Sequence, residues 1–182
     1  MISSKAVLSS LSAVEHSLMR KVNHWRPPRW VRWWMLASTK CGDGWFWAFC
    51  GVAVLASHDP GKYAAFLAAA LAAATGFVLF MVLKKIIARR RPCVLEPSCW
   101  ATLLPRDQFS FPSGHSITAF AVAVPLSYYF PSTAPVLLAL AVSVAFSRII
   151  LGVHFLTDVI AGSILGSLLG YLAVVGVAAL LI

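Results

Sequence analysis

The hydrophobic residues of this chain gather in long runs that contain few charges. Residues 63–83 carry no charged side chain, and a helix of that length rises roughly 32 Å, which is enough to cross a membrane. Residues 159–182 are likewise uncharged. This pattern predicts an all-α fold, a polytopic membrane helix bundle with about five transmembrane helices. The apolar stretches are 44–57, 63–83, 113–130, 135–151 and 159–182.

The N-terminal segment, residues 1–40, has a different pattern. Its first half carries apolar residues at helical spacing, and its second half interleaves Trp with Arg, which is typical of a segment lying in the plane of the lipid headgroups. We therefore expect an N-terminal interfacial amphipathic helix followed by a transmembrane catalytic bundle over residues 41–182, together forming a single domain, 1–182. The alternative is that Trp34–Thr39 enter the bilayer as part of a further span.

Composition agrees with a membrane protein. The chain is 60% hydrophobic and 12% charged, with a mean hydropathy of +0.82, well above an ordinary soluble domain. Its net charge of +9 would indicate nucleic acid in a soluble protein, but here it favours anionic lipid headgroups or phosphate as partners. The four cysteines are too scattered for a disulfide scaffold or a zinc site. They are Cys41, Cys50, Cys93 and Cys99.

Polar residues near a span are costly and indicate function. If five helices cross in alternation, the end of the second, the start of the third, the end of the fourth and the start of the fifth lie on one side. Three polar clusters fall at these points and are therefore expected to converge. They are Lys84 with Arg91 and Pro92; Pro112, Ser113, Gly114 and His115; and Ser147, Arg148, His154 and Asp158.

These residue types suit phosphoryl transfer. Fixed cations and the backbone amides of a helix start can bind a phosphate and its transition state. Of two histidines, one can attack phosphorus while the other protonates the departing oxygen. Asp158 follows His154 by four residues, so its carboxylate can hold the tautomer of the imidazole if the helix has begun there.

The three clusters, in this order and spacing, resemble the three-part motif of the type 2 phosphatidic acid phosphatases, and the surrounding helices resemble the bacterial membrane branch of that superfamily. The resemblance implies that His154 forms a phosphohistidine, that Asp158 orients and polarises it, and that His115 protonates the leaving hydroxyl and then activates water. It also implies that no metal or other cofactor is needed. The implied phosphate-binding residues are Lys84, Arg91, Ser113, Gly114 and Arg148.

The predicted function is therefore a metal-independent membrane lipid phosphatase, a phosphoric ester hydrolase. Its substrate would be a phosphorylated membrane lipid such as phosphatidylglycerophosphate, phosphatidic acid, or a polyprenyl phosphate or diphosphate; no nucleic-acid partner is expected. One alternative is a phosphotransferase that uses the same phosphohistidine. Another is a non-enzymatic anionic-lipid-binding or transport protein, which would have no use for paired histidines beside an aspartate. The sequence does not give the oligomeric state.

Other polar residues are interpreted as structural. Lys85, Arg89 and Arg90 are expected to be interface charges, and His16, His24 and His58 have no identifiable partner in the sequence. Three glycines recur every fourth residue on the last span, which indicates a face for close helix packing within the chain. They are Gly162, Gly166 and Gly170.

The sequence does not decide which side of the inner membrane holds the site. All the basic residues except Lys62 lie on the catalytic side, so the positive-inside rule favours a cytoplasmic site. Many bacterial members of the family that the chain resembles instead face the periplasm. Cys93 and Cys99 also lie in the catalytic-side loop, where an oxidising compartment could join them.

Overall fold

The computed structural model describes residues 4–95 and 108–180, and this part of the chain is helical apart from turns and an isolated bridge between Arg90 and Phe109. The expected all-α fold is confirmed. The helices are α1 (Ser4–His24), α2 (Arg29–Cys41), α3 (Gly44–Ala56), α4 (Lys62–Ile87), α5 (Pro92–Leu95), α6 (Gly114–Tyr129), the short 3-10 helix η2 (Pro131–Thr133), α7 (Ala134–Ile150) and α8 (Leu156–Leu180).

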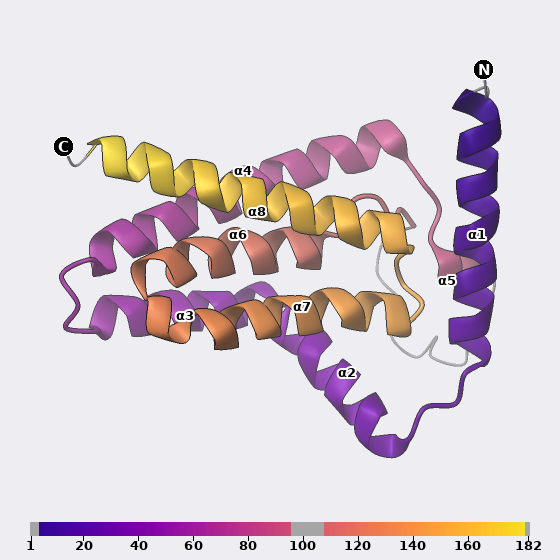
Figure 1. Ribbon diagram of the computed structural model, residues 1–182, viewed down its shortest axis with the longest axis horizontal. Helices are drawn as coiled ribbons and strands as arrows, with labels where there is room; N and C mark the ends of the chain where they lie inside the picture. Colours follow the sequence, from indigo (N-terminus) through magenta and orange to yellow (C-terminus); the bar gives the residue numbers. More distant parts are fainter. Residues whose placement is uncertain (1–3, 96–107, 181–182) are drawn as a thin grey trace.

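Five of these helices, α3, α4, α6, α7 and α8, run side by side along the long axis of the molecule (Figure 1). Helix α1 stands across one end of the bundle, and α2 leads obliquely from that end to α3 (Figure 1). Helix α4 ends, α6 begins, α7 ends and α8 begins at this same end. The alternation deduced from the apolar runs therefore brings the three polar clusters to one end of the bundle.

Helix α6 is the centre of the bundle. It packs against α8, α4 and α7, and most of its residues from Ser116 to Leu126 are buried. A helix enclosed by other helices presents little surface to lipid, so its side chains can be small and include polar hydroxyls. The buried residues of α6 are Ser116, Ile117, Ala119, Ala121, Val122, Ala123, Pro125 and Leu126.

Close contact between α6 and α8 depends on glycine. A Cβ added to Gly162 would lie 2.7 Å from the carbonyl oxygen of Ser113, and one added to Gly170 would lie 2.9 Å from Cδ of Pro125. A Cβ on Gly166 would meet the carbonyl oxygen of Ile117 even more closely. The prediction that these glycines form an intramolecular packing face is confirmed.

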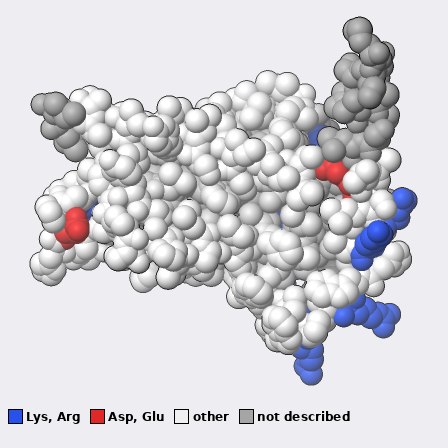
Figure 2. Space-filling model, viewed as in Figure 1, with Lys and Arg blue, Asp and Glu red and all other residues white. Residues whose placement is uncertain are grey.

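Helices α4 and α8, and α7 together with η2, are long and apolar enough to cross a membrane. The described surface along the middle of the bundle lacks charge on the face that Figure 2 draws, whereas Lys and Arg gather at the end where α1 and α2 lie. Helix α3 has 13 residues and α6 has 16, both shorter than a full crossing. The count of five transmembrane helices thus remains a prediction.

The N-terminal segment is divided between two helices that behave differently. The second half of α2 packs on α7, where Ser38 and Ser143 share a hydrogen bond of 2.9 Å between their hydroxyls. Its tryptophans Trp30, Trp33 and Trp34 are exposed, as expected for side chains that face lipid or the interface. The end of α2 thus belongs to the bundle, while α1 covers the bundle's end (Figure 1).

Candidate active site

A backbone pairing joins the first two clusters. Helix α4 ends at Ile87 and is followed by the C-cap residue Ala88, whose left-handed conformation (φ 47°) reverses the chain and whose N–H donates to the Lys84 carbonyl at 3.1 Å. Residues 89–91 then run beside residues 108–110. The pairing consists of the Arg90–Phe109 bridge and the hydrogen bonds Ser110 N–H to Arg89 O, 2.7 Å, and Arg91 N–H to Gln108 O, 3.2 Å.

The second and third clusters are joined at the start of α6. Ser113 occupies the N-cap position of α6, and its N–H donates to the Asp158 carbonyl at 3.1 Å. Both residues are fully buried. Ser116 donates its hydroxyl to the Ser113 hydroxyl at 3.0 Å. Because Gly162 has no side chain, α8 can approach Ser113 closely enough for these contacts.

The loop between α7 and α8 carries the predicted nucleophile. Gly152 adopts a positive φ of 69°, and the N–H groups of Val153 and His154 both donate to the Arg148 carbonyl at 3.2 Å. His154 lies two residues before α8, whereas Asp158 is in its first turn. His154 therefore precedes the helix and Asp158 lies inside it, but their side chains still come together at the helix start.

The neighbours of His154 fix its tautomer. Its Nε2 lies 2.9 Å from Nη1 of Arg91, and because a guanidinium only donates, Nε2 must accept and hold a lone pair. In the neutral ring the proton is then on Nδ1, which lies 3.8 Å from Oδ2 of Asp158. That separation is longer than a hydrogen bond, and Nδ1 has no hydrogen-bond partner among the described residues.

His154 is 2% exposed, and this burial lowers the pKa of its imidazole from 6.5 to about 3. The charges of Arg91 and Arg148 act in the same direction, while Asp158 opposes them. A neutral imidazole with its lone pair on Nε2 is the form that can attack phosphorus.

The carboxylate of Asp158 has partners besides the imidazole. Its Oδ2 accepts from the N–H of Phe155 at 2.8 Å, and its Oδ1 accepts from Nη1 of Arg89 at 2.8 Å. The sequence-based interpretation of Arg89 as an interface charge was therefore wrong. The positive φ of Ala88 reverses the chain immediately before Arg89, whose side chain reaches Asp158.

Helix α1 supplies a buried carboxylate to the same network. Oε2 of Glu15 accepts from Nη2 of Arg89 at 2.6 Å, and Oε1 accepts from the Thr157 N–H at 2.9 Å and from its hydroxyl at 2.6 Å. The Arg89 guanidinium lies over the Phe155 ring at 4.0 Å, and His16 meets the same ring edge-on at 5.0 Å. The ring contact of His16 fits its interpretation as a structural residue.

The general-acid candidate, His115, lies in the first turn of α6, and its Nε2 donates to Oδ1 of Asp43 at 3.2 Å. Nearby, Nη1 of Arg148 donates to the hydroxyl of Thr39. Thr39 lies in the last turn of α2 and Asp43 between α2 and α3, a region that none of the three clusters includes.

The remaining cation of the three clusters, Lys84, contacts the same aromatic ring as the start of α6. Its Nζ lies 4.6 Å from the centroid of Phe80, and a Cβ on Gly114 would lie 3.0 Å from the same ring. Gly114 thus leaves room for Phe80, whose ring contacts both the lysine and the start of α6. The charges of Arg91 and Arg148 act on both His115 and His154.

Residues 63–181 match the PAP2 superfamily. The chain belongs to the PAP2 superfamily. Phosphatidylglycerophosphatase B of Bacillus subtilis is 39% identical over 109 residues, which cover 54% of this chain and 51% of that protein. Decaprenylphosphoryl-5-phosphoribose phosphatase of Mycolicibacterium smegmatis is 35% identical over 104 residues, covering 57% of this chain and 56% of that protein. Undecaprenyl-diphosphatase of Sulfolobus acidocaldarius is 38% identical over 99 residues, covering 53% of this chain and 48% of that protein. The chain spans about half the length of these curated relatives.

Two solved structures share the fold over most of the chain. The phosphatidylglycerolphosphate phosphatase of Bacillus subtilis superimposes with a TM-score of 0.72 at 30% identity, covering 90% of this chain and 84% of that one. LpxE of Aquifex aeolicus gives 0.71 at 27% identity, covering 86% and 92%. The predicted family is confirmed, and the chain is a multi-pass membrane protein of this fold.

Several residues of the site lie outside the stretch that matches the PAP2 superfamily: Glu15, Thr39 and Asp43. Asp43 carried a signal, since it is one of only six acidic residues in the sequence and directly precedes the apolar stretch 44–57. Glu15 gave no such signal, because a single acid on an amphipathic helix is ordinarily a solvated residue.

No three His, Cys, Asp or Glu side chains in residues 4–95 and 108–180 lie close enough together to hold a metal ion. Of the cysteines whose pairing was left open, Cys93 is buried in α5 and Cys99 lies outside the described residues.

Proposed function

We propose that this PAP2 protein is a metal-independent membrane lipid phosphatase that works through a phosphohistidine on His154. The observation that carries the proposal is the contact between Arg91 and His154. It leaves the Nε2 lone pair of a neutral, buried imidazole beside a cation that can bind a phosphoryl oxygen. When the phosphate binds, the Arg91 guanidinium moves from Nε2 to a phosphoryl oxygen and frees the nitrogen.

In the first step, Nε2 of His154 attacks phosphorus. A P–N bond forms, the P–O bond to the lipid breaks, and the lipid oxygen takes a proton from His115. In the second step His115 takes a proton from water, the water oxygen bonds to phosphorus, and the P–N bond breaks to release phosphate. Lys84, Arg91, Arg148, Ser113 and the Gly114 amide hold the phosphoryl oxygens throughout.

The relatives support a proposal for the substrate class. Their names specify a phosphatidylglycerophosphate, a decaprenylphosphoryl phosphoribose and an undecaprenyl diphosphate, each of which carries a phosphate group on a long-chain lipid. We propose a substrate of the same class for this chain, a phosphate monoester or diphosphate presented at the membrane surface. The location of the site at one end of the apolar bundle supports this proposal.

The test is release of inorganic phosphate from a panel of lipid phosphates by the purified protein in detergent, with EDTA present. We expect turnover of at least one lipid, inhibition by vanadate, and loss of activity in His154→Ala to below about one per cent of wild type. Loss on chelation that magnesium restores would contradict the mechanism, as would a well-folded His154→Ala variant that remains active. Transfer of labelled phosphate to an added lipid, without release, would indicate a phosphotransferase.

A further inference from the structure

The junction of α2 and α3 touches the proposed general acid. Helix α2 ends at Cys41 and α3 begins at Gly44, so only Gly42 and Asp43 separate them. A Cβ on Gly42 would lie 2.7 Å from Cδ2 of His115 and 2.7 Å from Cγ1 of Val144. Only a residue without a side chain lets the imidazole pack this closely on the junction, so Gly42 brings the backbone against one side of the His115 ring.

Helix capping is the ordinary explanation for an aspartate at position 43, but the geometry does not support it. Asp43 occupies the N-cap position of α3, where aspartate commonly accepts a hydrogen bond from the first turn of the helix. Here the side chain makes no such capping bond. Its Oδ1 instead accepts from Nε2 of His115 at 3.2 Å, from a residue that is 72 positions away in the sequence.

The positive charges around His115 explain why an acidic partner would help it to act as an acid. Arg148 and Arg91 both act on the imidazole as cations and disfavour the imidazolium that must protonate the leaving group. Lys84 adds a further positive charge near the start of α6 through its contact with Phe80. Asp43 is the anion that acts on His115 among the described residues. The phosphate-binding cations thus work against the acid unless a carboxylate opposes them.

We propose that Asp43 is a positioning residue for His115: it accepts the Nε2–H, leaves Nδ1 to exchange the proton, and stabilises the imidazolium. The inference rests on the proposed phosphatase function. In the first step Nδ1–H gives its proton to the departing lipid oxygen, and in the second step the Nδ1 lone pair takes a proton from the attacking water. Nε2–H remains on Asp43 in both steps, so the imidazole needs no rotation between them.

Two substitutions separate this role from helix capping. Asp43→Ser keeps a good N-cap residue but cannot reach His115, whereas Asp43→Glu keeps a carboxylate but is a poor cap. We expect the serine variant to unfold at nearly the wild-type temperature and to lose about 10- to 100-fold in kcat/KM. The glutamate variant should be more active than the serine variant, even though glutamate is the poorer cap. The reverse order, with activity following stability, would overturn the proposal.

The leaving group supplies a readout that a merely structural role would not move. p-Nitrophenyl phosphate releases a stable phenolate that needs no proton, while a lipid phosphate releases an alkoxide that does. The loss of kcat/KM in Asp43→Ser should therefore be several-fold smaller for the aryl ester than for the lipid. With the lipid, the basic limb of kcat/KM against pH should move about one unit lower, because the imidazolium has lost its anion. Equal losses for both esters and an unmoved limb would contradict the assignment.

Two controls complete the experiment. Asp59 lies at the other end of the bundle, where its carboxylate accepts from the Gly61 N–H at 2.7 Å, so Asp59→Asn should leave both readouts unchanged. In a His115→Asn background, Asp43→Ser should cause little further loss, since the two residues act as a unit. A wild-type protein that hydrolyses neither ester would refute the proposed function itself. An active wild type with an unaffected Asp43→Ser variant would refute only the role of Asp43.

Discussion

The protonation of His154 is set by the side chains around it. Arg91 donates to Nε2, burial removes the stabilising water, and the pKa falls to about 3. Since an exposed histidine titrates near 6.5, the folded and unfolded proteins bind different numbers of protons between these values. The unfolded chain takes up the proton in this window, so this residue lowers the stability of the fold as the pH falls below 6.5.

We therefore expect His154 to remain neutral from pH 8 to about pH 5 in the substrate-free protein, because the buried ring cannot accept a second proton beside Arg91. Nitrogen-15 NMR of histidine-labelled protein in detergent measures this, with the resonance assigned by its loss in His154→Asn. The same protein unfolded in denaturant, whose histidines titrate at about 6.5, supplies the reference titration. A His154 midpoint near 6.5 would contradict the proposed nucleophile state.

For single residues of the candidate site, the sequence predicts those that stand at a fixed spacing from one another. It misses those that distant segments of the chain bring to the site. His154, Arg148 and Asp158 lie within a dozen positions of one another, so their proximity follows from one helix end and one helix start. Arg89 was misjudged because its role depends on the left-handed turn at Ala88, which favours glycine and is not indicated by an alanine.

Among the elements, α1 has the least expected connection to the site. Its residue Glu15 is 5% exposed and accepts hydrogen bonds from Arg89 and from Thr157, which precedes Asp158. An amphipathic pattern predicts that a helix lies on a surface, but it does not indicate which surface or which polar residue is buried. For α2, too, the pattern did not indicate which residues are buried: its last turn packs on α7, while its tryptophans are exposed.

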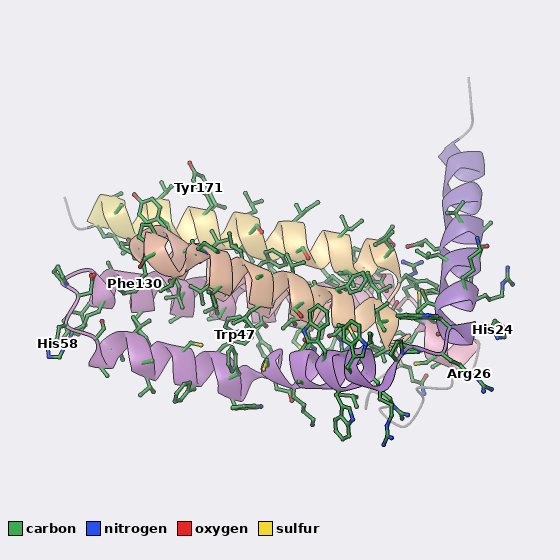
Figure 3. The ribbon with its side chains drawn as sticks, turned by 60° about the horizontal axis from the view of Figure 1, so that its bottom comes forward. His24, Arg26, Trp47, His58, Phe130 and Tyr171 are labelled. Carbon is green, nitrogen blue, oxygen red and sulfur yellow. The ribbon has the colours of Figure 1, made fainter. Side chains whose placement is uncertain are left out.

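Replacing Glu15 with alanine should release α1 from the bundle. The Arg89 guanidinium and the Thr157 N–H would lose a charged acceptor, at a cost of about 2 kcal/mol. We expect a lower unfolding temperature in detergent and faster proteolysis of the N-terminal helix. His24→Ala, an exposed change on the same helix, is the matched control and should have neither effect (Figure 3). Unchanged proteolysis in the Glu15 variant would show that the ion pair does not hold α1.

The packing of α8 on α6 gives a second prediction at the scale of elements. Gly166→Ala would drive a methyl group into the Ile117 backbone, which cannot move without shifting α6. We expect a loss of about 1–3 kcal/mol in stability, measured by thermal unfolding. Gly176→Ala on the same helix is the control, because nothing lies within 4 Å of the added Cβ, and it should be neutral or slightly stabilising. Equal stability of both variants would contradict the close packing of the two helices.

For the whole molecule, the apolar runs were enough to predict the bundle and the convergence of its polar ends, because alternation fixes which helix ends lie together. They did not predict the length of each span. Helix α6 is surrounded by other helices and needs less apolar length than a lipid-facing one, and α3 continues from α2 after a bend. Burial by neighbouring helices explains the short α6, and the bend after α2 explains the short α3; a pattern of apolar residues records neither.

The side of the membrane that holds the site is also a property of the whole molecule. Among the described residues, every Lys and Arg except Lys62 lies at the site end, and this bias acts while the chain is inserted, which favours a cytoplasmic site. His24 and His58 are both exposed and lie at opposite ends of the bundle, His24 at the site end (Figure 3). Replacing either one leaves the charged residues of the loops in place.

We predict that, in a variant without the four native cysteines, His58→Cys reacts with a membrane-impermeant maleimide in intact bacterial cells. His24→Cys should react only with a permeant reagent if, as we predict, the site end faces the cytoplasm. Mass shift on a gel measures both reactions, and lysed cells show that each cysteine is reactive. Labelling of His24→Cys from outside, with protection of His58→Cys, would put the site on the outer face. The substrate would then be a lipid phosphate exposed on the outer leaflet, and a Cys93–Cys99 disulfide would become chemically stable there.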